Sequence, residues 1–401
     1  MPSNKNYYVI YLCAAIGPLA GNAILAMLPE LQANFNSSLD DVLLSIPAFM
    51  FPFAFFQLFS GSLSDKWGRK RTLLLGLIIY ALSSAGIALM DNLVAFLLLR
   101  IGQGLGNAFI SPVALAMLGD LSDARRYGVA IGFYGSFTTA GIAVGPLVGG
   151  FLAEIDWRLA FALFAALAML SFLLVLVMIS YPGSDTRSPA TSISKNIREA
   201  ISHRNIALIS IIGAVSFFAI IGSISFLSDH LRTDNALLFT AADVGMIISI
   251  GGFIGIFFSP IAGRFIDVCS PRLAALVGMS ITIPSVVLTA FVQDFYLFLT
   301  LSAFNGIGGA FLWTGLLTTA VAEIPRMRGT TSSIFNSSRF SGYAISPILL
   351  GPVYSHFNYI GIALTCGALL IIASLLAYIL PRKKCKELSE QPSVPAGDQR
   401  R

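Results

Sequence analysis

Twelve apolar stretches of about twenty residues each make up most of this chain. We place them near residues 7–28, 42–62, 72–90, 94–118, 128–153, 158–180, 206–228, 243–263, 273–291, 296–320, 331–355 and 358–380. A helix that crosses a hydrocarbon core of roughly 30 Å needs about that many apolar residues, and it satisfies its own backbone hydrogen bonds where water is absent. The composition agrees, with 56% hydrophobic residues, 11% charged residues and a mean hydropathy of +0.81. The sequence therefore predicts an all-α integral membrane protein with twelve transmembrane helices.

The second half of the chain repeats landmarks of the first half. Residues 100–108 (RIGQGLGNA) match residues 302–310 (SAFNGIGGA) with glycines in register at an offset of 202, and residues 61–65 return at 263–267 with the same offset. Three positions of the fifth span return at an offset of 201: Gly141, Pro146 and Gly150 recur as Gly342, Pro347 and Gly351. Two like-oriented, pseudo-symmetric bundles of six helices are typical of transporters whose substrate site lies between the halves, near the bilayer midplane.

Polar segments divide the chain into four parts. We expect a first bundle at residues 1–180, a cytoplasmic linker at 181–205, a second bundle at 206–380 and a disordered cytoplasmic tail at 381–401. Within the linker, residues 193–201 predict a short amphipathic helix on the membrane surface. The first span is too long and lacks the small-residue pattern of a cleaved signal peptide.

Positive charge predicts the orientation, because Lys and Arg are retained on the cytoplasmic side. Of the 25 Lys and Arg residues, only Arg158 and Arg232 fall in outer segments, and Arg100 and Arg339 fall within spans. We therefore expect a multi-pass protein of the inner (plasma) membrane with both termini in the cytoplasm. The net charge of +5 then reflects topology and attraction to anionic lipid, and it does not indicate a nucleic-acid partner.

The sequence offers little for covalent chemistry. Its four cysteines and three histidines form no cluster with the spacing of metal ligands, and it has no phosphate-binding Gly-Lys loop for direct ATP drive. We expect neither an enzyme nor a resident cofactor or metal.

Three motifs resemble those of a known family. Residues 61–71 (GSLSDKWGRKR) lie between spans 2 and 3 and closely resemble the signature loop of the major facilitator superfamily. Residues 100–106 resemble its second motif, including the intramembrane Arg100. In span 5, the spacing of Gly132, Gly141, the pair Gly145 and Pro146, and the pair at 149–150 is similar to the signature of the antiporter branch, which includes the twelve-span drug:proton antiporters.

The resemblance implies a cytoplasmic latch around the first motif, formed when the substrate path opens outward. Gly61 and Gly68 permit close backbone approach, and Asp65 would cap the amino end of span 11. Arg69 would pair with Asp120 at the inner end of span 4. The second half repeats the motif in weaker form, with Asp267 and with Glu323 near Arg264. The alternative is that the basic loop only enforces topology.

Span 5 carries glycines where neighbouring helices need closeness. Gly141, Gly145 and the pair Gly149 and Gly150 allow backbone contact, and Pro146 allows a kink. The resemblance implies a seam that seals the path against leak. The alternative is a packing motif without directional meaning.

Two arginines within the spans are the main candidates for polar contacts, because buried ionisable groups normally face a substrate path or a partner. Arg100, with Gln103 beside it, either bonds backbone carbonyls of span 1, as its motif implies, or faces the path. Arg339, flanked by Asn336 and Tyr343, either contacts substrate or bonds carbonyls. No Asp or Glu falls in the middle of a span, so two cations without a fixed acid favour an anionic or zwitterionic solute.

Other residues expected along the substrate path are polar or aromatic: Asn22, Asn107, Tyr134, Thr138, Ser216, Asn305 and Trp313. We expect a monomeric secondary transporter that exports small amphipathic organic compounds by alternating access, with proton exchange as the energy source implied by the resemblance. Uptake or uniport of an anionic metabolite is the alternative. A non-transporting sensor would be expected to bring an extra soluble domain, and a lipid-modifying enzyme would need clustered catalytic groups.

Overall fold

The computed structural model describes residues 4–121, 127–179, 193–233, 237–324 and 328–380. All regular elements within these ranges are helices. The first half forms α1 (Asn4–Ala23), η1 (Ile24–Ala26), α2 (Leu28–Phe35), α3 (Leu39–Leu43), α4 (Ser45–Trp67), α5 (Arg69–Ala88), α6 (Leu93–Leu121) and α7 (Tyr127–Met178). The second half forms α8 (Ile193–Ser202), α9 (Arg204–Thr233), α10 (Ala241–Val268), α11 (Pro271–Leu288), η2 (Thr289–Phe291), α12 (Phe295–Glu323) and α13 (Arg328–Ile379).

Ten of the described helices are long and apolar enough to cross a membrane. Two of them, α7 and α13, have 52 residues each, about twice the length that one crossing needs. Each is interrupted by one residue with non-helical backbone angles, Asp156 in α7 and Asn358 in α13. Each therefore supplies two crossings, which confirms the predicted twelve.

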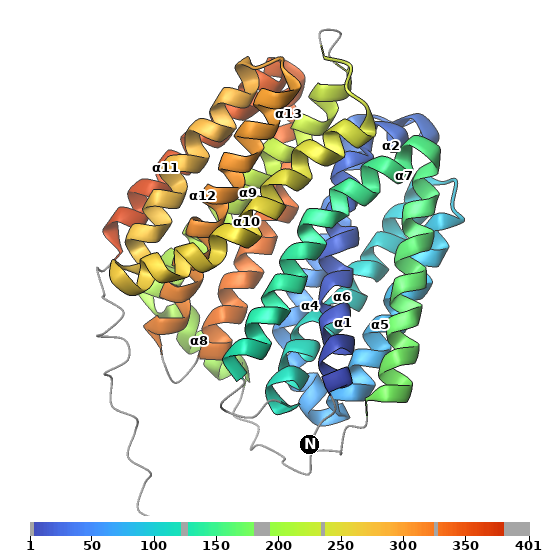
Figure 1. Ribbon diagram of the computed structural model, residues 1–401, viewed down its shortest axis with the longest axis vertical. Coiled ribbons are helices and arrows are strands. Elements are labelled where there is room, and N and C mark those ends of the chain that lie inside the picture. The colour runs from blue at the N-terminus through green and yellow to red at the C-terminus, as the bar shows by residue number, and fades with distance from the viewer. Residues whose placement is uncertain (1–3, 122–126, 180–192, 234–236, 325–327, 381–401) are drawn as a thin grey trace, which may run out of the picture.

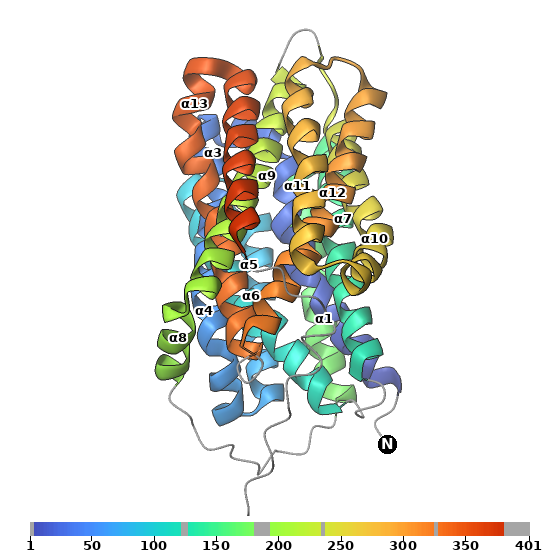
Figure 2. The same ribbon diagram turned by 90° about the vertical axis from the view of Figure 1, so that its left-hand side faces the viewer.

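The helices of the two halves lie side by side as two bundles (Figure 1). We call the side on which the N-terminus lies the lower side, as Figure 1 draws it, and the opposite side the upper side. The short helices α2 and α3 lie on the upper side, whereas α8 lies on the lower side (Figures 1 and 2). The first part of the predicted linker, residues 181–192, and the whole predicted tail lie outside the described residues.

The helix predicted at residues 193–201 is present as α8. Ile197 and Ala200 on this helix pack against Ile206 of α9 and Ile334 of α13. This apolar cluster holds α8 against the lower end of the second bundle.

One end of a span differs from the prediction, and the difference matters for the site. Span 7 was expected to end at residue 228, where the hydropathy falls, but α9 continues to Thr233. Asp229 therefore lies one turn inside the helix, and only 6% of its surface is exposed. This carboxylate lies just beyond the predicted end of span 7.

Candidate substrate path and seams between the bundles

Glycines bring α10 into backbone contact with the first crossing of α7, the part before Asp156. The contact lies in the upper halves of both. A Cβ atom added to Gly150 would lie 2.2 Å from the carbonyl oxygen of Ala241, and one added to Gly245 would lie 2.6 Å from the carbonyl oxygen of Pro146. Carbon and oxygen atoms do not approach so closely, so only glycine fits at these points. Small residues at helix interfaces permit this distance in membranes. The seam between the bundles is therefore closed in its upper half.

The lower halves of the same two helices are apart. On α7, Gly135 lies eleven residues, about three turns, below Pro146 and on the same helix face. On α10, Gly263 lies eleven residues below Gly252, again on the same face. A Cβ atom added to Gly252 would lie 2.7 Å from Ala143 of α7, whereas one added to Gly135 or Gly263 would meet nothing within 4 Å. The bundles thus separate towards the lower side.

A second seam, between α4 and α13, shows the same change from contact to open space. The rings of Phe53 and Phe340 lie 4.7 Å apart, and the Ser337 hydroxyl donates a hydrogen bond to the carbonyl oxygen of Ala54 at 3.0 Å. Two turns lower, a Cβ atom added to Gly61 would meet nothing within 4 Å. Both seams therefore close from the middle of the bundles upwards.

The span 5 motif divides between two faces of α7. Added Cβ atoms at Gly141, Gly145 and Gly149 would lie 2.4 to 2.5 Å from backbone oxygens of α1, in the same bundle. By contrast, Pro146 and Gly150 meet α10 of the other bundle. Residues four apart share a helix face, so the first three glycines pack the bundle internally and the other two residues lie at the seam.

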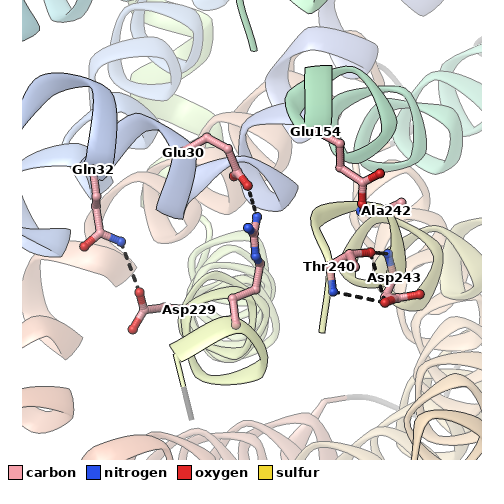
Figure 3. Close-up of polar contacts among 8 residues, drawn as sticks. Glu30, Gln32, Glu154, Asp229, Thr240, Ala242 and Asp243 are labelled. Atoms are coloured by element: carbon pink, nitrogen blue, oxygen red, sulfur yellow. Dashed lines mark hydrogen bonds and ion pairs between the residues drawn. The ribbon is translucent and has the colours of Figure 1, made fainter. Parts of the chain in front are cut away.

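Polar side chains join the bundles on the upper side (Figure 3). Gln32 on α2 reaches towards Asp229 on α9, and its amide donates to the carboxylate at 3.1 Å. Glu30, on the same short helix, forms an ion pair with Arg232 of α9. None of these four residues was among the predicted site residues. The signal that could have found them was Arg232, one of only two basic residues in the predicted outer segments.

A third upper contact links α7 with the start of α10. The Glu154 carboxylate accepts a hydrogen bond from the backbone N–H of Ala242 at 3.1 Å (Figure 3). Thr240 and Asp243 form a capping box at the same helix start, in which each side chain accepts from the other residue's backbone N–H. Glu154 thus satisfies one of the free N–H groups at the amino end of α10.

Residues of the first motif lie together at the lower end of the first bundle. Gly68 has a φ of +97°, a conformation that favours glycine, and it makes the corner between α4 and α5. Arg69 forms ion pairs with Asp120 on α6 and, at 3.0 Å, with Asp65. The expected pairing of Arg69 with Asp120 is thus present here, inside one bundle. Whether it serves as a latch stays a prediction.

The equivalent residues of the second bundle are arranged differently. Asp267 is exposed and has no ion-pair partner among the described residues. Glu323 accepts a hydrogen bond from the Asn205 amide at 2.6 Å. The lower ends of the two bundles are therefore not copies of each other at this motif.

Arg100 is fully buried inside the first bundle. Its Nε donates to the carbonyl oxygen of Ser45 at 3.2 Å and its Nη1 donates to Gln103 Oε1 at 2.8 Å, while the guanidinium stacks on Phe49. The Gln103 amide in turn donates to Ser84 at 2.8 Å. The expected carbonyl partner in span 1 is wrong, because Ser45 begins α4, the second span, which packs closely on α6.

Arg339 has a different environment, formed by three aromatic rings. Its guanidinium carbon lies 3.6 Å from the ring centre of Trp313, 4.2 Å from that of Phe340 and 4.5 Å from that of Phe217. Its Nε atom is buried and has no hydrogen-bond partner in the part of the chain that the structure describes. The rings come from α9, α12 and α13, and they match the flat faces of a guanidinium. The edge of this cation is left free for an acceptor.

Arg339 lies where the α4–α13 seam ends. It is two residues from Ser337 and adjacent to Phe340, the two residues of α13 that contact α4. Just beyond these contacts the bundles separate towards the lower side. The aromatic cluster therefore lies beside the opening between the bundles.

The other predicted path residues are partly brought together. The Tyr343 hydroxyl approaches Asn22 Oδ1 at 3.4 Å, which links α13 with α1 near mid-bundle. Four of the others bond near neighbours: Asn107 accepts from Ser111, Tyr134 donates to the Ser111 carbonyl oxygen, Thr138 donates to the Tyr134 carbonyl oxygen, and Asn336 lies 3.5 Å from Ser332. Ser216 and Asn305 each have a buried side-chain oxygen without a hydrogen-bond partner among the described residues. The described residues thus place Asn22, Tyr343 and the Arg339 cluster at the interface of the bundles.

Sequence comparison identifies the family. The chain matches the Major Facilitator Superfamily profile over residues 10–238 and again over residues 206–397. The chain belongs to the Major Facilitator Superfamily. Members of this family are transporters and not enzymes, so the protein is a multi-pass membrane transporter.

Curated relatives of this Major Facilitator Superfamily protein are bacterial exporters. The chain is 28% identical to the Bacillibactin exporter of Bacillus subtilis (strain 168), over 96% of this chain and 98% of the relative. It is 25% identical to the Multidrug efflux protein YfmO of the same organism, over 94% and 93% of the two chains. It is 22% identical to the Quinolone resistance protein NorA of Staphylococcus aureus (strain COL), over 97% and 99%.

A solved structure has the same fold. It is a bacterial homologue of the human lysosomal transporter Spinster, in an inward-facing and unoccupied conformation. The two structures superpose with a TM-score of 0.75 at 19% sequence identity, covering 96% of this chain and 99% of the other. This likeness confirms the predicted fold.

Proposed function

We propose that this transporter exports small amphipathic organic compounds that carry an acidic group. The observation that carries the proposal is the Arg339 cluster, a cation between three rings that has no acidic partner among the described residues. A planar guanidinium binds a carboxylate through paired hydrogen bonds, and the surrounding rings suit an aromatic or apolar body on the same molecule. The exporters among its relatives favour the outward direction.

The proposed mechanism is alternating access with the lower side in the cytoplasm. Substrate would enter between the separated lower halves and reach Arg339. The upper contacts would then break while the lower halves approach, so that the compound leaves on the outer side. We propose proton exchange as the energy source and the inner membrane as the location, with both termini cytoplasmic. In the outward-open state, Asp65 and the Arg69–Asp120 pair would form the lower latch.

Replacing Arg339 with glutamine is expected to lower the flux of an acidic aromatic dye at least tenfold, because a charge-assisted hydrogen bond contributes about 1.5–3 kcal/mol. The measurement is pH-gradient-driven flux of fluorescein, an aromatic carboxylate, and of ethidium, an aromatic cation, in proteoliposomes. Flux of ethidium should change less than about twofold, because a cation makes no attractive contact with the Arg339 charge that the substitution would remove. Arg339→Lys should give an intermediate fluorescein flux, since it keeps the charge but loses the planar stacking.

The matched control is Arg272→Gln. Arg272 also stacks on a ring, that of Tyr378, but its Nη1 donates to the carbonyl oxygen of Leu380 at the lower end of the second bundle. This variant should transport both dyes as the wild type does. Equal loss of both dyes in Arg339→Gln, or unchanged selectivity, would refute an acidic substrate. Flux of fluorescein in the direction opposite to export would instead support uptake of an anionic metabolite.

A further inference from the structure

The upper closure contains a buried carboxylate, Asp229, whose partners among the described residues are all neutral. Asp229 accepts hydrogen bonds from the Gln32 amide at 3.1 Å and from the Tyr354 hydroxyl at 2.8 Å, with the Thr233 hydroxyl at 3.5 Å. Among the described residues it has no ion-pair partner, because the neighbouring Arg232 is paired with Glu30. Hydrogen bonds from neutral groups are therefore what stabilises this buried carboxylate in place of an ion pair.

These partners differ in what they connect. Tyr354 on α13 and Thr233 on α9 belong to the same bundle as Asp229, so their bonds survive any movement of one bundle against the other. Gln32 on α2 belongs to the opposite bundle, and Figure 3 shows it reaching across to Asp229. The Gln32–Asp229 bond must therefore break when the upper side opens.

We propose that Asp229 is a proton-binding site whose protonation releases the upper closure. An ionised carboxylate accepts the Gln32 bond with charge assistance, and a neutral carboxyl group accepts it much more weakly. The bond with Tyr354 tolerates protonation, because the hydroxyl oxygen can accept a hydrogen bond from the protonated carboxyl group, whereas the hydroxyl donates one to the ionised carboxylate. A proton on Asp229 therefore weakens the link between the bundles and leaves the links within the bundle intact.

This site deepens the proposed export cycle and rests on it for the assignment of the upper side to the outside. An acidic exterior would then favour the upper-open state from which substrate leaves. The protein carries no carboxylate at mid-span among the described residues, so a proton-binding group at the closure supplies a link between external pH and conformation. The ligand of this site is the proton itself.

Other titratable groups surround Asp229 and could give a pH response of their own. On α9, His230 is the next residue, with its ring stacked on Tyr359, and Arg232 lies one turn on. On α2, Glu30 pairs with Arg232. On α3, Asp40 lies against Gly351 of α13. On α13, Tyr354 is itself titratable. The experiment must separate these groups from Asp229.

The test measures the distance between the upper ends of the bundles as a function of pH. Spin labels replace Leu89, at the end of α5, and Phe291, at the end of α11, in a background whose four cysteines are alanine. Both positions are exposed, at 76% and 63%, and neither lies in the polar cluster. Double electron–electron resonance in lipid nanodiscs then reports the populations with short and long distances.

In the wild type, the ratio of long to short distances should rise about tenfold once Asp229 is protonated as the pH is lowered, the factor expected when a charge-assisted bond becomes an ordinary one. Asp229→Asn, which mimics the neutral carboxyl group, should show the raised ratio at both pH values. Glu30→Gln should raise the ratio at both pH values but keep the pH response, since it removes a second link and leaves Asp229 in place.

Two results would overturn the proposal. One is an Asp229→Asn variant that keeps the wild-type pH response. The other is loss of that response in His230→Gln or Asp40→Asn, with Asp229→Asn unchanged. Either result would leave the dye selectivity of Arg339 unaffected, so failure of the gate and failure of the export proposal can be told apart.

Discussion

Replacing Gly150 with leucine is expected to reduce transport below about a tenth of the wild-type flux while the protein still inserts into the membrane. Even a Cβ atom at this position would lie 2.2 Å from the carbonyl oxygen of Ala241, and a backbone atom cannot move aside as a side chain can. The upper seam could then close only if α7 and α10 moved apart. Proteoliposome flux, normalised to the amount of reconstituted protein, measures the effect.

The same helix offers a matched control. Phe151→Leu places an identical side chain at the next position of α7, where the native ring is 49% exposed. Flux in this variant should stay within about twofold of the wild type. If Gly150→Leu transports normally, the seam is not required for closure. If Phe151→Leu is equally inactive, the loss reflects the helix rather than the seam.

Replacing Arg100 with alanine is expected to destabilise the first bundle by about 3 kcal/mol, because it leaves two buried acceptors, the Ser45 carbonyl oxygen and Gln103 Oε1, without their donor at about 1–3 kcal/mol each. The apparent melting temperature in detergent should fall by several degrees. Arg158→Ala is the control, since Arg158 pairs at the upper rim with Asp91, which is 84% exposed. Its loss should change stability by about 0–1 kcal/mol.

This experiment also decides between the two interpretations of Arg100 that the sequence leaves open. A structural arginine lowers stability, and it lowers flux only in proportion to the protein lost. An Arg100→Ala variant with an unchanged melting temperature and altered dye selectivity would instead assign Arg100 to the substrate path. Arg339→Gln should show the reverse pattern, because no acceptor among the described residues loses a hydrogen bond when this guanidinium is removed.

Most of the fold follows from local sequence. Hydropathy alone identifies twelve crossings, even where the structure joins two of them into one long helix interrupted at Asp156 or Asn358. The internal repeat predicts two bundles, and the polar and apolar pattern of residues 193–201 predicts α8. These features depend on residues close together in the chain, so one sequence is enough to find them.

The partners of the site residues do not follow from the sequence. Helical spacing separates Gly141, Gly145 and Gly149 from Pro146 and Gly150, but it does not tell which face meets α1 and which meets α10. The three rings around Arg339 come from three helices, and no local pattern links them. Such contacts depend on how the bundles pack.

The burial of Asp229 shows the same limit at a single residue. The polar residues that follow residue 228 lower the local hydropathy and mark the end of a span. Gln32 and Tyr354 cover this carboxylate from α2 and α13, far away in the sequence. Tertiary packing therefore makes a buried site from a segment whose own composition resembles a loop.

The central claim is that the bundles rock about their middle, so that opening on one side closes the other. Spin labels at Leu89 and Phe291 report the upper side, and labels at Val177 and Val268, which are 81% and 83% exposed, report the lower side. Gly150→Leu forces the upper seam apart. The account predicts that this variant lengthens the upper distance and shortens the lower one relative to the wild type. A longer upper distance with an unchanged or longer lower distance would contradict it.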